Sequence, residues 1–227
     1  MASVQSVESH ARSGRAMRAV GFTEHLLFFD TDHDRRISLR ETQRGLTRLG
    51  LGHLVTLPGA LFIHAGVAGL GLLRANFQSP AHLSLPEVGF VRHPDTDLVD
   101  REGQFDAARL SSVFAQYGRT FSGEALTLPE LLGMTTGRVI ERGTRDAKDL
   151  LLLPGGIAAA ALEWVALWWM AGEFREGKRV LSQQTVLRFY TDSHFFNDVA
   201  RHVTLEREAR SERLLGRVRN FVQTWLA

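Results

Sequence analysis

The chain has 227 residues, of which 44% are hydrophobic and 23% are charged, which is enough for one folded domain with a substantial core. Its formal net charge is only +2, so it lacks the basic excess of a nucleic-acid-binding protein, and no nucleic-acid partner is expected. Cysteine is absent, which excludes disulfides, thiolate zinc sites, iron–sulfur clusters and cysteine-ligated haem.

Residues 1–20 contain scattered serines and arginines and no apolar stretch. We expect them to form a mobile N-terminal arm and not a secretory signal, so the protein is not expected to be secreted. From Phe22 to Gly50 the hydrophobic pattern predicts a helix, an acidic loop and a second helix that Gly50 and Gly52 end.

The acidic loop, residues 30–41, matches the twelve-residue loop of a calcium-binding EF-hand. An apolar residue, Ile37, occupies its eighth position. Calcium takes six to eight oxygen ligands, and the loop offers side-chain oxygens together with the backbone carbonyl of Arg36. The predicted calcium ligands are Asp30, Asp32, Asp34, Arg36 (by its carbonyl), Ser38 and Glu41.

The sixth loop position departs from this pattern, because Arg35 stands where the sharp turn favours glycine at positive φ. Arg35, Arg36 and Arg40 also place three positive charges beside the four acids of the loop. We therefore predict a weak calcium site. The alternative is an acidic helix cap that holds no ion.

An uncharged apolar segment, residues 54–73, follows the loop unit. Its length permits a membrane span, but Pro58 and four glycines are expected to weaken a helix or bend it into a hairpin. Burial in the core and contact with lipid both stay open for this segment.

A second helix–loop–helix pattern has its loop at residues 119–130. Arg119 and Phe121 stand at its first and third positions, so this degenerate hand cannot bind calcium in the usual way. Its eighth residue, Leu126, is expected to pair with Ile37 in a short strand between the two loops. A second apolar segment, residues 150–171, and a charged C-terminal helix, residues 201–227, complete the chain. The predicted fold is mainly α, with paired EF-hand-like helix–loop–helix units and two apolar helical segments.

The order of these blocks resembles the caleosin family. The resemblance covers residues 22–196 and rests on His25-Leu-Leu-Phe-Phe-Asp30 before the loop, the proline-containing apolar segment, Asp95-Thr96, Asp100-Arg101-Glu102-Gly103-Gln104-Phe105, Glu163-Trp164, and Tyr190-Thr-Asp192-Ser193 with Phe195. Residues 21–200 would then be one caleosin-like domain. Because all but two of the 27 basic residues are arginine, we expect a divergent, Arg-rich, bacterial member.

The resemblance implies a haem-dependent peroxygenase that is calcium-modulated and associated with lipid. Such an enzyme would transfer oxygen from a fatty-acid hydroperoxide to an unsaturated fatty acid, another unsaturated lipid or a sulfide. The cofactors it implies are haem b and calcium, and the family's two haem histidines match His25 and His93, as catalytic residues and iron ligands. The resemblance leaves open whether one or both ligate. It implies a place on a membrane or lipid droplet that faces the cytoplasm.

Two other functions are compatible with the same residues. One is a non-enzymatic calcium-binding protein of a lipid-droplet or membrane surface that carries no haem. The other is a soluble helical domain of paired EF-hands with an unrelated ligand. A haem absorption band that is lost when His25 or His93 is replaced would favour the enzyme. The oligomeric state is not predicted.

Overall fold

The computed structural model describes residues 17–18, 22–73, 81–84, 98–99, 104–143 and 153–226. Most of these residues are helical, which confirms the mainly α prediction. The helices are α2 (Phe22–Leu26), α3 (Leu39–Arg48), α4 (His53–Leu73), α6 (Ala107–Tyr117), α7 (Leu128–Gly143), α8 (Leu153–Ala171), α9 (Gln183–Thr191) and α10 (Phe195–Leu226). The strands are β1 (Met17–Arg18), β2 (Arg36–Ser38), β3 (His82–Ser84), β4 (Gln104–Phe105), β5 (Ala125–Thr127), β6 (Glu173–Arg175) and β7 (Lys178–Ser182).

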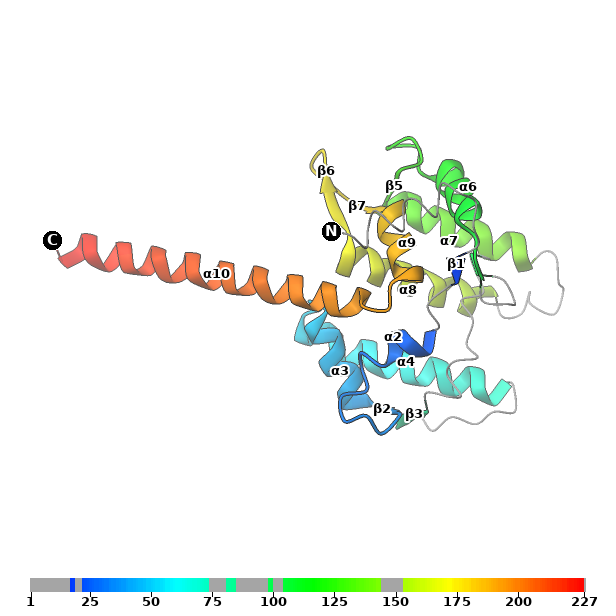
Figure 1. The fold of residues 1–227 in the computed structure, drawn as a ribbon, viewed down its shortest axis with the longest axis horizontal. Coiled ribbons are helices and arrows are strands. Elements are labelled where there is room, and N and C mark those ends of the chain that lie inside the picture. The colour runs from blue at the N-terminus through cyan, green and yellow to red at the C-terminus, as the bar shows by residue number, and fades with distance from the viewer. Residues whose placement is uncertain are drawn as a thin grey trace.

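Two helix–loop–helix units organise the chain, one formed by α2 and α3 and the other by α6 and α7 (Figure 1). Each loop ends in a short strand whose central residue, Ile37 or Leu126, is buried at the predicted eighth position. The expected pairing of these two residues is wrong. Ile37 pairs with Leu83 of β3, and Leu126 pairs with Leu181 of β7, so each loop has its own antiparallel partner strand.

The larger core lies among α6, α7, α8 and α9. Phe114, Leu126 and Met134 are fully buried there, and Trp164 of the second apolar segment joins them. A smaller cluster of Phe28, Leu49 and Ala200 attaches the first unit to the start of α10. The beginning of α10 therefore packs against the first helix–loop–helix unit.

The apolar segment 54–73 forms one helix, α4, and not the bent hairpin that its proline and glycines favoured. Pro58 lies near the start of this helix. Proline has no backbone N–H, so the hydrogen bond to the carbonyl of Leu54 is missing. Leu54 is 93% exposed, so the helix loses this bond at its solvent-exposed end. One face of α4 is buried through Thr56, Ala60 and His64 and packs on α3. The outer face exposes large apolar side chains, namely Leu54, Val55, Leu57, Leu61, Phe62 and Ile63.

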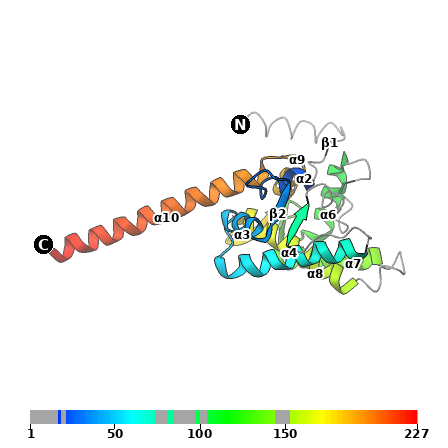
Figure 2. The ribbon, with the colours of Figure 1, turned by 90° about the horizontal axis from the view of Figure 1, so that it is seen from below.

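Among the residues described, the structure contains no helix with the combined length and hydrophobicity needed to cross a membrane. Helix α10 extends well beyond the rest of the molecule (Figures 1 and 2), and its residues from Leu205 to Leu215 are exposed. Met17 and Arg18 fall within the predicted N-terminal arm, where they form β1 and pair with β4.

Candidate functional site

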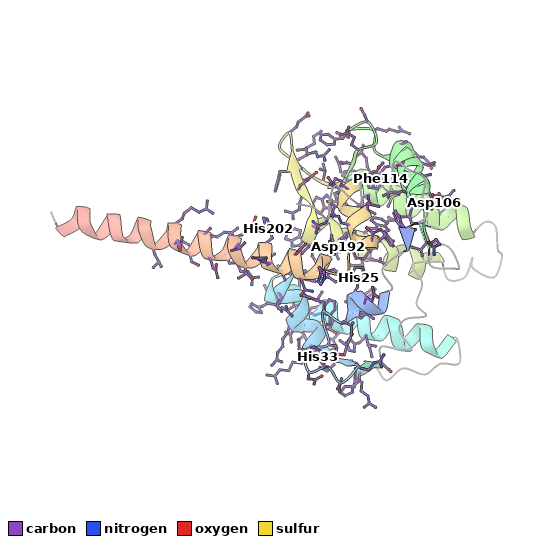
Figure 3. All side chains as sticks on the ribbon, viewed as in Figure 1. His25, His33, Asp106, Phe114, Asp192 and His202 are labelled. Atoms are coloured by element: carbon purple, nitrogen blue, oxygen red, sulfur yellow. The ribbon has the colours of Figure 1, made fainter. Side chains whose placement is uncertain are left out.

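His25 lies at the end of α2, where the first unit meets α9 and the start of α10 (Figure 3). The residue is only 4% exposed. Its imidazole stacks on Phe189 of α9, with ring centroids 5.0 Å apart and an interplanar angle of 6°. Phe196 of α10 contacts the same ring edge-on at 5.2 Å. The predicted haem ligand is thus held in an aromatic cluster built from three helices.

His93, the second predicted haem ligand, lies outside the described residues, as do Asp95 and Thr96. Of the other histidines described, His33, His53, His82, His194 and His202 are exposed. His64 is buried, and its Nε2 lies 2.8 Å from the hydroxyl of Thr42 on α3.

A buried imidazole among aromatic rings is a donor that haem iron accepts, and its apolar surroundings suit a porphyrin. Because so little of His25 is exposed, a planar cofactor would reach the ring only if part of the aromatic cluster moved. The chemistry of the donor therefore fits haem, whereas the packing around it is closed.

In the first loop, the carboxylate oxygens of Asp30, Asp32 and Glu41 lie within 4.8 Å of one another. Asp34, a further predicted ligand, is not part of this group. Its Oδ1 accepts from the backbone N–H of Arg36 at 2.7 Å. Asp30 is 2% exposed, and its Oδ1 has no hydrogen-bond partner among the described residues. A buried oxygen beside two further carboxylates is a donor set that fits a hard cation.

The sixth position of the loop has the backbone conformation that the sequence predicts. Arg35 adopts φ +63°, in the left-handed region, and its N–H donates to Asp30 Oδ2 at 3.1 Å. The loop thus keeps the turn although a side chain stands where glycine is favoured.

Glu41 closes the first loop through hydrogen bonds to both ends of it. Thr31 donates to Oε1 through its N–H and its hydroxyl, each at 2.9 Å. Ser38, the N-cap of α3, donates to Oε2 in the same two ways, also at 2.9 Å. Burial raises the pKa of Glu41, but these four hydrogen bonds outweigh it and hold the pKa below its ordinary value.

The second loop has the same closure. Thr120 donates to Glu130 Oε1 from its N–H at 2.7 Å and from its hydroxyl at 2.8 Å. Thr127 donates to Oε2 at 2.9 and 2.7 Å. Burial opposes these bonds, yet they lower the pKa of Glu130 to about 2.

Comparison with known proteins assigns the family. A family model described as caleosin related protein matches residues 19–199. The chain belongs to the caleosin family. A protein named probable peroxygenase 4 from Arabidopsis thaliana is 23% identical over 172 residues, which cover 75% of this chain and 81% of that protein. A protein named peroxygenase from Lilium longiflorum is 25% identical over 169 residues, which cover 74% of this chain and 65% of that protein. No solved structure matches the chain.

The hydrogen bonds of the two loops involve three threonines that the sequence did not single out, namely Thr31, Thr120 and Thr127. Thr31 and Thr120 occupy the second position of each loop, and a hydroxyl residue, Ser38 or Thr127, occupies the ninth. This repetition across the two loops was a visible signal for the shared closure. The stacking of Phe189 on His25 had no such signal, because the two residues are far apart in the sequence and no pattern links them.

Proposed function

We propose that the protein is a haem-dependent peroxygenase that works at a lipid surface and responds to calcium. Its reaction would reduce a fatty-acid hydroperoxide to the alcohol while one oxygen atom passes to an unsaturated lipid or a sulfide. The family match over residues 19–199 carries this proposal, and the matched range includes His25, the residue for which the resemblance implies haem ligation. Two relatives named peroxygenase support it.

In this proposal His25 holds the iron of haem b, and His93 serves as the second histidine. Haem, when bound, supplies the redox chemistry that cleaves the hydroperoxide O–O bond and transfers the oxygen. The protein residues orient and shield the reacting groups. In the closed cluster Phe189 fixes the plane of the His25 imidazole by parallel stacking and Phe196 contacts its edge, and part of this cluster would move to admit haem.

The lipid surface would be contacted by α4. Its outer face exposes six large apolar side chains in a helix without charged residues, an arrangement that lies readily along a lipid surface. Fatty-acid hydroperoxide and unsaturated fatty acid would then reach the protein from the lipid phase. A position on a membrane or lipid droplet, facing the cytoplasm, belongs to the same proposal.

Calcium would bind Asp30, Asp32 and Glu41 in the first loop, with Asp34, the Arg36 carbonyl and Ser38 completing the predicted set. The loop follows directly on the segment that carries His25. Backbone hydrogen bonds from Phe28 to His25 and from Asp30 to Leu26 form the turn between them. Cation binding at Asp30 would therefore fix the end of the segment that positions His25.

The second candidate is a non-enzymatic calcium-binding protein of a lipid-droplet or membrane surface without haem. The closed packing around His25 favours it, because this imidazole is already buried among aromatic rings.

Oxygen transfer distinguishes the two candidates. Haem-loaded protein would receive a fatty-acid hydroperoxide labelled with heavy oxygen and a sulfide, and mass spectrometry would follow the label. The peroxygenase is expected to give labelled sulfoxide with the wild type and with His202→Ala, an exposed histidine on α10. His25→Ala is expected to give none. Label-free sulfoxide or no product from the wild type would favour the second candidate.

A further inference from the structure

The carboxylate of Glu41 already accepts as many hydrogen bonds as it can. Its two oxygens offer about four lone-pair positions, and four donors occupy them. Two of the donors are the backbone N–H groups of Thr31 and Ser38, and two are the hydroxyls of the same residues. We call this arrangement of Thr31, Ser38 and Glu41 the hydroxyl clasp.

The second loop shows that such a clasp does not depend on a cation. Thr120, Thr127 and Glu130 form it at the same loop positions and with the same four donors. This loop has Arg119 at its first position and Phe121 at its third, where calcium loops carry oxygen ligands. The clasp is therefore a way to close a loop of this length without metal.

The first loop differs from the second because its clasp leaves several carboxylates close together. One carboxylate oxygen from each of Asp30, Asp32 and Glu41 lies within 4.8 Å of the other two, so three negative charges are close together. Asp30 Oδ1 is buried without a hydrogen-bond partner among the described residues. Burying an unsatisfied charged oxygen is unfavourable, and a bound cation would relieve it. Two arrangements thus compete for the same Glu41 carboxylate.

We propose that the Thr31 hydroxyl is an affinity-determining group of the calcium loop, because it competes with calcium for Glu41. Bidentate ligation by Glu41 uses one lone pair on each carboxylate oxygen, so calcium must displace one donor from each. The Thr31 and Ser38 hydroxyls are the donors that give way, because a hydroxyl can rotate whereas the backbone N–H groups are held by the loop. The clasp keeps the metal-free loop closed and raises the calcium concentration at which the loop fills. This inference rests on the calcium part of the proposed function and is independent of haem.

Calcium titration calorimetry on the full chain, stripped of metal by a chelator, tests the proposal. Thr31→Val removes the hydroxyl and keeps the backbone N–H, at a residue that is exposed and so has little packing to disturb. The proposal predicts that Thr31→Val binds calcium roughly three- to tenfold more tightly than the wild type. This factor corresponds to the one hydrogen bond, to a charged acceptor at a partly exposed site, that calcium no longer has to break. Thr31→Ser, which keeps the hydroxyl, should bind as the wild type does.

Thr120→Val is the matched control, since it removes the equivalent hydroxyl from the loop that has no acid at its first and third positions. Both valine variants should melt below the wild type in the metal-free state, and only Thr31→Val should bind calcium more tightly. Thr31→Ala gives a second test with a smaller side chain, should the valine variant misfold. Wild type that binds calcium while Thr31→Val and Thr31→Ala bind it no more tightly would overturn the clasp and leave the calcium site standing. Absence of binding at millimolar calcium in wild type and both variants would contradict the clasp together with the calcium part of the proposed function.

Discussion

His64 Nε2 lies 2.8 Å from the hydroxyl of Thr42, and both side chains are buried between α4 and α3. The Thr42 hydroxyl donates its hydrogen to the carbonyl of Ser38 at 3.3 Å. A hydroxyl has a single hydrogen, so Thr42 donates to Ser38 only in the His64 tautomer that carries its hydrogen on Nε2; in the other tautomer Thr42 donates to Nε2 instead. These contacts tie the apolar helix α4 to Ser38, the ninth residue of the first loop and the N-cap of α3.

Replacing Thr42 tests the importance of this tie. Thr42→Val removes the hydroxyl but keeps the shape, and we expect it to lower the free energy of unfolding by about 1–3 kcal/mol, because a buried polar partner of His64 is lost. Urea unfolding measures the change. The double variant Thr42→Val/His64→Leu should recover part of the loss, since an apolar pair needs no hydrogen bond. A Thr42→Val protein as stable as the wild type would show that the tie contributes nothing.

The lowered pKa of Glu130 makes stability depend on pH. Its folded pKa is about 2 and its ordinary value is 4.5, so the folded state favours the charged form. The resulting stability is present above pH 4.5 and is lost as the pH falls toward 2. The stability gap between wild type and Glu130→Gln should therefore narrow across this window. Thermal melts at a series of pH values measure it, and a gap that stays constant would contradict the assignment.

Arg35→Gly should stabilise the protein. Arg35 adopts φ +63°, which costs a residue with a side chain roughly 1–2 kcal/mol, whereas glycine adopts it freely and loses only about 0.5–1 kcal/mol in chain entropy. The neighbouring Arg36 lies in β2, so Arg36→Gly is the matched control and should lose stability. Equal losses in both variants, measured by chemical unfolding, would contradict the strain at Arg35.

The sequence predicted the helical class, both helix–loop–helix units and the left-handed turn at Arg35, because these depend on local patterns. It could not predict that Ile37 pairs with Leu83, since the three-residue strand β3 has no periodicity that identifies it. The surroundings of His25 were beyond prediction for another reason. Phe189 and Phe196 approach it only after α9 and α10 pack against the first unit, and such tertiary contacts leave no local pattern.

Contact of α4 with lipid predicts an effect of charge on its outer face. Leu61 is 51% exposed there, and Leu61→Asp should weaken binding to phospholipid vesicles by roughly tenfold, as expected from losing one buried leucine side chain. Leu132→Asp, at an exposed leucine of α7, should bind vesicles as the wild type does. Co-sedimentation measures both, and equal weakening by the two substitutions would place the lipid contact elsewhere.

The proposed haem site rests on His25, and the absorption spectrum of protein reconstituted with haem b tests it most directly. The wild type and His202→Ala should show the same strong Soret band. His25→Ala should lose or shift this band while circular dichroism shows that its helices remain. A wild type that takes up no haem, or a His25→Ala spectrum identical to that of the wild type, would contradict the assignment of His25 as the iron ligand.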